Sequence, residues 1–432
     1  DTGKLRDEAK RVKIDKAKAA IYYKRAADGG NFIIMYMYGK MLCKGDGIKE
    51  DKQKGLYYLK NAADNGIVEA MYEYGKMLFE GDGIKEDKNE AASYMKNAAD
   101  NGHINAMTFL ALILLNGDGI KKDIKESIKY LRMAAESDDP ETNSKIAAYQ
   151  LALIFQNGNG VQENKKEAAR YFKKSAEEGF ELSMLEYARI LQRGEGVPKD
   201  LKKAAIYYKK CIAKGNIKAM RLYSMMVFNE DEEFPNKQEA IKYSKLAADT
   251  GDSYVMYIYA FIIDKCDKTP SGQREAAQYF KMAADNGNVA SMRCYGVALF
   301  NGTGVEVDKK EALRYLKMGA DAGDEIAMYN YAYLRDKGGG VDIDKPEAAI
   351  YYRKAIDKGH DKAMFNLACM LYNGDGIKEN KEEAAKYLKI LAEKGNRVAI
   401  DAYATMLENG IGVEVDLEEA SRYRKMLQET EY

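Results

Sequence analysis

The sequence is short of histidine, and this shortage narrows the chemistry that it can support. Its 432 residues include only two histidines, His103 and His360, and each directly follows a glycine. A zinc site, or a Ser–His or Cys–His catalytic arrangement, needs histidine close to further ligands or to a nucleophile. We therefore expect a protein that is not an enzyme, with no metal, no cofactor and no catalytic residue, and we interpret both histidines as solvated loop residues.

The sequence also lacks net charge and long apolar runs. Lys plus Arg and Asp plus Glu each number 68, so no overall field draws the chain to nucleic acid or to an anionic membrane. No apolar run approaches the roughly 20 residues that span a bilayer, and residues 1–14 are too charged for a signal peptide. We therefore expect a soluble protein that neither binds nucleic acid nor inserts into membranes.

Disulfides are a further absence that the sequence indicates. The cysteines are odd in number, and they fall at different places of the repeat described below, whereas disulfides that staple a repeat would lie in phase. Free thiols suit a reducing compartment, so we expect a cytoplasmic protein. The five cysteines are Cys43, Cys211, Cys266, Cys294 and Cys369.

What the sequence does have is a period of 36 residues. The chain is longer than the roughly 250–300 residues that one hydrophobic core supports, and the segment Gly-Asp-Gly-Ile-Lys-Glu-Asp at residues 45–51 returns at residues 81–87. One step of the pattern is 41 residues long, and two of the eleven registers have lost their glycines while keeping their length. The registers start at Gly45, Gly81, Gly117, Gly158, Gly194, Glu230, Cys266, Gly302, Gly338, Gly374 and Gly410.

Each register predicts a pair of helices, here named helix A and helix B. In helix A, before the turn, apolar residues recur at helical spacing, and the residue six positions before the turn is always Gly, Ala or Ser, which lets a neighbouring helix approach closely. After the turn, an Asp or Asn is followed three residues later by Glu, as in Asp87 and Glu90, which predicts an N-cap with a reciprocal capping box. Helix B carries a Tyr in every register, interpreted as a packing residue, and usually ends at a glycine such as Gly102.

These motifs resemble one known family. The pattern of each register is similar to the Sel-one-like repeat, a relative of the tetratricopeptide repeat. In helix A it has a small residue, then Tyr or Leu followed by Gly or Ala. The turn and helix B follow as Gly-x-Gly-[Val/Ile]-x-x-[Asp/Asn] and Glu-Ala-Ala-x-x-Tyr-x-x-x-Ala-Ala-x-x-Gly. The resemblance covers nearly the whole chain. It implies an all-α, right-handed superhelical solenoid of antiparallel helix pairs, used as an adaptor or scaffold whose partners lie on a concave side lined by helix A.

The pattern predicts one continuous solenoid over residues 1–432. After a partial repeat at residues 1–30, the repeats begin at about residues 31, 67, 103, 144, 180, 216, 252, 288, 324, 360 and 396. The start of the chain matches helix A one period later, which indicates that it begins inside a twelfth repeat of a longer array. Helix pairs should also continue through residues 217–287, where the turn glycines are missing, because the helix-B tyrosines and closing glycines keep phase there.

The side of helix A that faces away from its own core positions is unexpectedly apolar. We name its two central rows row 9 and row 5, after their distance in residues before the start of each turn. Tyr, Phe, Arg and Lys dominate these rows, which is the composition of a recognition surface. The alternative is that a tightly wound superhelix buries these rows between neighbouring A helices. The expected partner-binding residues are Tyr36, Tyr72, Tyr149, Arg221, Tyr257, Phe261, Arg293, Tyr329, Tyr333 and Phe365.

The sequence thus predicts a protein–protein interaction scaffold that binds a partner segment in a groove lined by helix A. The expected partners are other proteins or peptide segments. Two alternatives from other classes stay open, namely a structural or self-associating array that acts as a spacer and, less favoured, a hydrolase. Formation of a homo-oligomer is likewise left open.

Overall fold

Helices account for the regular secondary structure of the described residues. The structure is a computed structural model that describes residues 16–137, 143–230, 233–234 and 237–429. Within these ranges the only β-type pairing is one isolated bridge inside a turn. The predicted all-α fold is therefore confirmed.

Helices A and B alternate along the chain, after a helical segment at residues 16–28. The A helices are α2 (Phe32–Lys44), α4 (Val68–Glu80), α6 (Ile104–Asn116), α8 (Ser144–Asn157), α10 (Glu181–Arg193), α12 (Ile217–Asn229), α14 (Ser253–Cys266), α16 (Val289–Asn301), α18 (Glu325–Lys337), α20 (Asp361–Asn373) and α22 (Arg397–Asn409). The B helices are α3 (Lys52–Asp64), α5 (Lys88–Asp100), α7 (Ile124–Ala135), α9 (Lys165–Glu177), α11 (Leu201–Ile212), α13 (Gln238–Ala248), α15 (Pro270–Asp285), α17 (Lys309–Asp321), α19 (Lys345–Ile356), α21 (Lys381–Glu393) and α23 (Leu417–Glu429).

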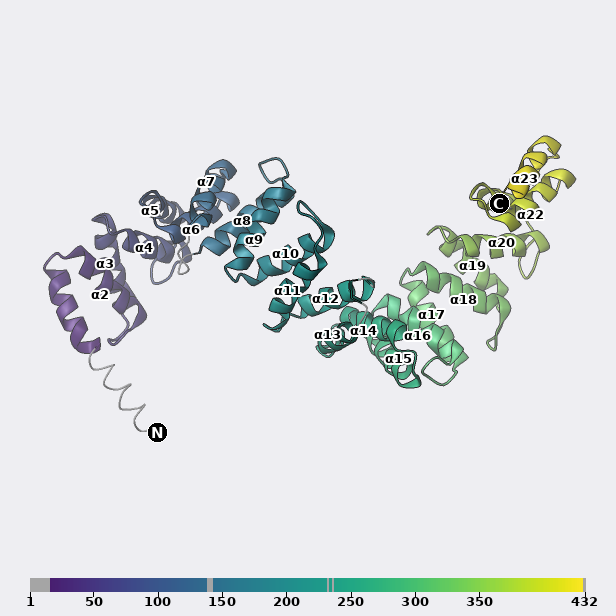
Figure 1. Ribbon diagram of the computed structural model, residues 1–432, viewed down its shortest axis with the longest axis horizontal. Coiled ribbons are helices and arrows are strands. Elements are labelled where there is room, and N and C mark those ends of the chain that lie inside the picture. The colour runs from purple at the N-terminus through teal and green to yellow at the C-terminus, as the bar shows by residue number, and fades with distance from the viewer. Residues whose placement is uncertain (1–15, 138–142, 231–232, 235–236, 430–432) are drawn as a thin grey trace. The chain divides into compact units, whose positions relative to one another are not determined.

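The chain forms two compact units, Asp1–Ala219 and Met220–Tyr432. Within each unit, a helix A packs against the helix B that follows it, and that helix B packs against the next helix A. Figure 1 shows this alternation from α2 to α11 in the first unit and from α13 to α23 in the second. A single continuous array with a right-handed superhelical path stays a prediction.

Small residues and an aromatic pair form the contact between the two helices of a repeat. A side-chain carbon added at Gly296 in α16 would lie 2.9 Å from Cγ of Leu316 in α17, so the absence of a side chain there permits the close approach of helix A to its own helix B. Beside this contact, Tyr295 meets the helix-B residue Tyr315 edge to face, with ring centroids 4.9 Å apart. Tyr315 of helix B therefore packs against helix A of its own repeat, as predicted.

In most repeats, glycines in the turn between the two helices adopt a left-handed backbone conformation. Gly374 and Gly376, after α20, have φ of 64° and 71°, and this left-handed region is costly for residues with a side chain. In the register at Cys266, which lacks both glycines, α14 ends instead on Asp267 with φ of −120°. The next helix starts at Pro270, capped by Thr269, and is 16 residues long. Helix pairs thus persist through the described part of residues 217–287, as predicted.

The predicted capping box is half correct. Oδ1 of Asp87 accepts a hydrogen bond from the backbone N–H of Glu90 at 2.9 Å, which is the expected N-cap. The backbone N–H of Asp87, however, donates to the carbonyl of Leu78 in helix A at 3.1 Å. The Glu90 carboxylate is thereby released from the cap, and it accepts a hydrogen bond from Nζ of Lys60 in the preceding repeat at 3.3 Å.

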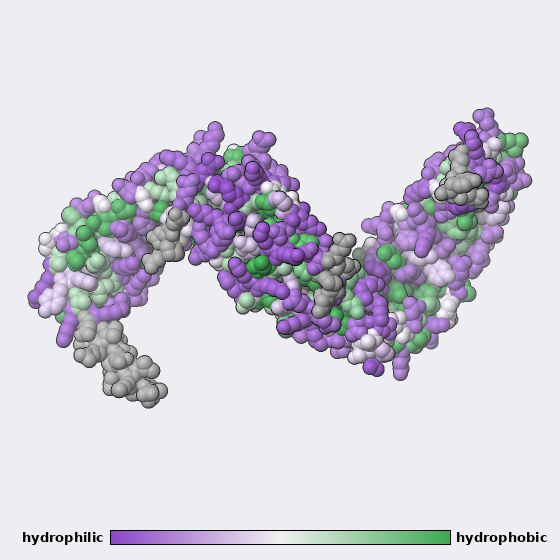
Figure 2. Space-filling view, in the orientation of Figure 1, coloured by the Kyte–Doolittle hydropathy of each residue, from purple (hydrophilic) through white to green (hydrophobic). Residues whose placement is uncertain are grey.

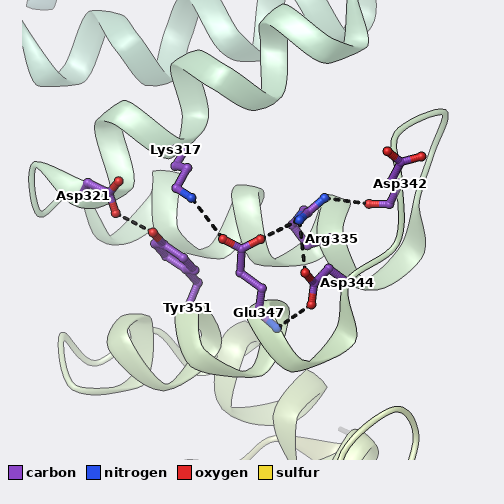
Figure 3. Close-up of polar contacts among 7 residues, drawn as sticks. All are labelled: Lys317, Asp321, Arg335, Asp342, Asp344, Glu347 and Tyr351. Atoms are coloured by element: carbon purple, nitrogen blue, oxygen red, sulfur yellow. Dashed lines mark hydrogen bonds and ion pairs between the residues drawn. The ribbon is translucent and has the colours of Figure 1, made fainter.

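This redirected glutamate belongs to a polar network that joins successive B helices. Figure 3 shows Glu347 of α19 between Lys317 of α17 and Arg335 of α18, with Nζ of Lys317 at 3.1 Å and Nε of Arg335 at 2.8 Å. In the same view, the hydroxyl of Tyr351 donates to Asp321 of the preceding repeat. Equivalent links, 30 residues apart, are Lys96–Glu126, Lys245–Glu275, Arg353–Glu383, Lys389–Glu419, Tyr58–Asp28, Tyr94–Asp64, Tyr130–Asp100, Tyr279–Asp249 and Tyr315–Asp285.

Candidate partner-binding face

The ten residues expected to bind a partner lie on A helices of both units. Tyr36, Tyr72 and Tyr149 belong to the first unit, on α2, α4 and α8, and the other seven belong to the second. All ten are partly exposed, and Tyr333 is the most exposed of them at 43%. The rows are therefore neither fully solvent-facing nor part of the core.

Row 9 is half-buried because its residues contact the start of the next helix A. Tyr329 stacks on His360, with ring centroids 4.5 Å apart and planes inclined by 21°. The guanidinium of Arg293 lies 3.3 Å from a carboxylate oxygen of Asp324. In each case the contacted residue lies 31 positions later and is the N-cap of the next helix A. Tyr72–His103 and Tyr149–Phe180 are the corresponding pairs in the first unit.

These contacts correct the interpretation of the two histidines. His103 and His360 are not solvated loop residues but the N-caps of α6 and α20, and each is half-buried under a tyrosine ring. Nδ1 of His103 accepts a hydrogen bond from the backbone N–H of Ala106, at 3.1 Å. Burial lowers the pKa of His103, so the neutral imidazole that can accept this bond is favoured. The sequence hid this role because histidine is not among the usual capping residues.

A third row of exposed apolar residues extends the face and was missed by the sequence interpretation. These residues lie 12 positions before the turn, three before row 9, and we name them row 12. On α14, Tyr254 of row 12 lies 6.4 Å from Tyr257, whose ring lies 6.1 Å from Phe261. The spacing i, i+3 and i+7 was the signal that could have revealed this row. Its exposed apolar members are Ile33, Leu182, Tyr254, Ile326 and Val398.

Two cavities open on this face in the second unit. The first, of about 270 Å³, lies between α14, α15 and α16, and Tyr257, Phe261 and Arg293 of the predicted set line it. The thiol of Cys294 also lines this cavity, and burial raises the pKa of that thiol, which favours its neutral form. The other lining residues are Asp264, Lys265, Gln273, Ala276, Ala277, Phe280, Val297, Ala298 and Thr303.

The second cavity, of about 210 Å³, lies between α20, α21 and α22 and carries no charged side chain. Phe365 of the predicted set lines it, together with Cys369 and Thr405 of row 5. An uncharged wall of this kind accepts an apolar side chain without leaving a charge unpaired. The remaining lining residues are Ala368, Tyr372, Asn373, Leu388, Ala402 and Met406.

Exposed charges of both signs lie on the face from α14 to α20. The side chains of Lys265 and Lys337, at the ends of α14 and α18, are 51% and 53% exposed, and Lys362 of α20 is also exposed. Among the carboxylates nearby, the side chain of Asp264 is 26% exposed and that of Asp336 is fully buried, whereas Glu325 of α18 and Asp361 beside Lys362 are exposed. Figure 2 shows green hydrophobic patches within a mainly purple, hydrophilic surface in both units.

A larger hollow, of about 1040 Å³, lies in the first unit between the segment 16–28, α2 and α3, and none of the predicted residues lines it. Tyr38, Tyr57 and Tyr58 line it together with charged residues. Tyr36 instead accepts a hydrogen bond from Nζ of Lys40 at 3.1 Å.

No group of three or more His, Cys, Asp or Glu side chains in the described ranges is placed to hold a metal ion. None of their helices is both long enough and apolar enough to cross a membrane.

Comparison with known protein families identifies the repeat. The model of the Sel1 repeat matches the chain at residues 7–31, 35–67, 68–103, 104–139, 145–180, 182–216, 217–252, 267–288, 290–324, 326–360, 361–396 and 398–423. The first match includes the twelfth register that the sequence indicated. A comparison with curated proteins finds no match.

Two solved structures illustrate what the chain is similar to. The chain is similar to c5321, a protective antigen of uropathogenic Escherichia coli strains with an SLR fold, at 22% identity and a TM-score of 0.75, over 96% of this chain and 91% of that one. A Sel1 repeat protein from Oxalobacter formigenes matches at 20% identity and a TM-score of 0.47, over 84% and 90% of the two chains.

Proposed function

The chain belongs to the Sel1 repeat family, and we propose that it is a scaffold that holds a segment of a partner protein against the A-helix face of its second unit. Solenoids of this family are in general protein-interaction scaffolds. The observation that carries the proposal for this face is that both cavities are lined by residues of rows 9 and 5. Partly exposed aromatic and Arg side chains beside preformed hollows are the usual anchors of a protein interface.

Half-burial of row 9 fits this role. The contact of Tyr329 with His360 holds the ring in one orientation, so little side-chain entropy is lost when a partner covers its remaining surface. The same contact gives Tyr329 a share in folding stability. A test of function must therefore separate lost binding from lost structure.

The test compares two double variants of the full chain against a display library of random 24-residue peptides. Tyr329→Ala with Phe365→Ala removes two rings of the face, whereas Ile350→Ala with Ile390→Ala removes exposed apolar side chains of B helices. We expect the first variant to lose about 2 kcal/mol of binding energy, roughly thirtyfold in Kd, towards peptides that the unmodified protein selects. The control should bind as before.

Circular dichroism and thermal unfolding show whether each variant is folded. If the ring variant, once shown to be folded at the assay temperature, binds the selected peptides with unchanged Kd, the scaffold face is assigned wrongly. The absence of any selected peptide would count equally against the proposal. Light scattering on the unmodified protein tests the alternative of a self-associating array, which predicts a mass above that of the monomer.

A further inference from the structure

We propose that Asn159, in the turn between α8 and α9, is a self-modification site that loses ammonia from its side chain in the folded protein and becomes Asp or isoaspartate. Water is the only second reactant. Three features of this turn carry the proposal: the glycine that follows Asn159, the backbone amide of that glycine, which has no hydrogen-bond partner in the described ranges, and the exposure of both residues. The proposal is independent of the scaffold function.

The sequence contains nine asparagines that are each followed directly by glycine. Glycine favours the reaction because it has no side chain to hinder its backbone nitrogen as that nitrogen attacks the preceding side-chain amide. On sequence alone, all of these pairs are candidates. They are Asn65–Gly66, Asn101–Gly102, Asn116–Gly117, Asn157–Gly158, Asn159–Gly160, Asn286–Gly287, Asn301–Gly302, Asn373–Gly374 and Asn409–Gly410.

Eight of the nine pairs lie at the C-terminal ends of helices, where the attacking nitrogen is held. The amide of Gly66 donates to the carbonyl of Ala63 at 3.0 Å, for example. Ring closure would break this hydrogen bond and turn the backbone out of its helical conformation. The same kind of bond holds Gly102, Gly117, Gly158, Gly287, Gly302, Gly374 and Gly410.

The ninth pair, Asn159 and Gly160, lies outside the helices. Both residues belong to the turn that follows α8, and both are exposed. Within the described ranges, the amide of Gly160 donates to no carbonyl or side-chain oxygen, and the side chain of Asn159 makes no hydrogen bond. Neither reacting group therefore has a hydrogen bond within the protein to lose before the ring closes.

Asn157, two residues earlier, is a matched comparison within the same turn. It is also exposed and also followed by glycine, but it is the last residue of α8, and the amide of Gly158 donates to the carbonyl of Ile154. The two asparagines thus share their solvent access and their following residue, and they differ in the restraint of the backbone. Differences in orientation of this kind change the rate of an intramolecular reaction by about tenfold or more.

The reaction balances with water as its only co-reactant. The backbone nitrogen of Gly160 loses its proton to water and forms a bond to Cγ of Asn159, and the Cγ–Nδ2 bond breaks as ammonia takes up a proton and leaves. Water then opens the cyclic imide at one of its two carbonyls. Opening at the side-chain carbonyl gives Asp, and opening at the backbone carbonyl gives isoaspartate, without any oxidation or reduction.

The turn accommodates the Asp product. The residue between the two turn glycines is Asp46, Asp82, Asp118 or Asp375 in four other repeats. Lys52 of the preceding repeat binds Asp82, at 2.5 Å, whereas Ile124 occupies the equivalent position beside the turn of Asn159. The reaction therefore adds an exposed negative charge where the preceding repeat offers an apolar side chain in place of lysine.

The experiment incubates the full-length protein at mildly alkaline pH and follows the loss of ammonia by peptide mass spectrometry, with fragment ions that separate Asn157 from Asn159. We expect Asn159 to react at least about tenfold faster than Asn157 while circular dichroism shows a folded protein. In guanidinium chloride the two rates should become similar, because the helix no longer holds Gly158. Equal rates in the folded protein, or the same preference for Asn159 in the unfolded chain, would overturn the proposal.

Two variants test whether the conformation of the turn controls the reaction. Asn159→Gln should remove the fast phase of ammonia release, and a fast phase that persists would assign it to another residue. Glu195→Asn recreates the sequence Gly-Asn-Gly-Val in the equivalent turn after α10, where Gly196 has φ of 75° and its amide also donates to no described acceptor. The introduced asparagine should react faster than Asn157 of the same protein. If it reacts as slowly as Asn157 in a variant with unchanged thermal unfolding, the free amide does not control the reaction and the proposal is wrong.

Discussion

At the scale of single residues, the tyrosine of helix B connects packing within a repeat to bonding between repeats. The ring of Tyr351 packs edge to face on Tyr331 of its own repeat, with centroids 4.6 Å apart. Its hydroxyl donates to Asp321 of the preceding repeat. Burial, followed by the hydrogen bond to this carboxylate, raises the pKa of Tyr351 to about 12. The neutral phenol is thus the form that the folded protein favours.

Replacement of Tyr351 by Phe should lower the free energy of unfolding by an amount that depends on pH. The loss of the hydrogen bond should cost about 1 kcal/mol at pH 8. Unfolded Tyr releases its proton near pH 10, whereas folded Tyr351 holds it to about pH 12. Between these values the unfolded state binds fewer protons, so the stability of the unmodified protein falls as pH rises. The variant lacks this contribution, and the difference between the two proteins should shrink.

Urea unfolding followed by circular dichroism at pH 8 and pH 11 measures this difference. Tyr57→Phe is the control, because the side chain of Tyr57 is exposed and it should change little at either pH. A difference between unmodified protein and Tyr351→Phe that is constant or larger at pH 11 would contradict the assigned role of the hydroxyl.

At the scale of helices and turns, the capping glutamate shows how one sequence pattern can serve two repeats. Glu347 occupies the capping-box position of α19, yet Nζ of Lys317 and the guanidinium of Arg335 bind its carboxylate. Burial raises its pKa, but the hydrogen bonds from these groups prevail and lower the pKa of Glu347 overall. The equivalent Glu167 instead pairs with Arg170 on its own helix, at 3.0 Å.

These two glutamates provide a matched pair of variants. Glu347→Gln should destabilise the protein by about 1–2 kcal/mol, because it removes the carboxylate that Lys317 contacts and leaves the largely buried Arg335 with Asp344 as its remaining carboxylate partner. Glu167→Gln should stay within about 0.5 kcal/mol, since it removes only an exposed pair within one helix. Both variants keep the N-cap, which uses the backbone N–H of the substituted residue. Equal losses in urea unfolding would mean that the ion pairs between repeats contribute nothing measurable.

The sequence could predict what depends on neighbours in the chain. Helix pairs, turn glycines and the Asp87 cap follow from local periodicity and backbone geometry. It could not predict that Glu90 would bind Lys60, since that choice depends on how closely two B helices 30 residues apart approach. For the same reason, the sequence left open whether row 9 is exposed or buried between neighbouring A helices. A wheel drawn for one helix contains no information about the N-cap of the next.

At the scale of the whole molecule, contacts between successive repeats distribute stability along the chain. From α2 to α11 and from α13 to α23, each helix packs against its neighbours in sequence, and the polar links between residues 30 positions apart join adjacent repeats. In such arrays, stability is approximately a sum of repeat terms and nearest-neighbour terms. Local unfolding should therefore stay local. The two compact units offer a direct way to examine this.

A proline placed inside a helix of one unit should unfold that helix and the helices packed against it, and it should leave the other unit folded. Leu110 lies inside α6 of the first unit and Leu367 inside α20 of the second, and both are buried. Proline at either position removes a helical hydrogen bond and costs about 3 kcal/mol or more. Hydrogen exchange of the full-length Leu110→Pro protein should show lost protection around α6, while α14 to α22 stay protected and bind selected peptides with unchanged Kd. Leu367→Pro should give the reverse pattern and abolish that binding.

If Leu110→Pro also removes protection from α14 to α22, the array unfolds as one cooperative block, and the nearest-neighbour description is wrong for this chain.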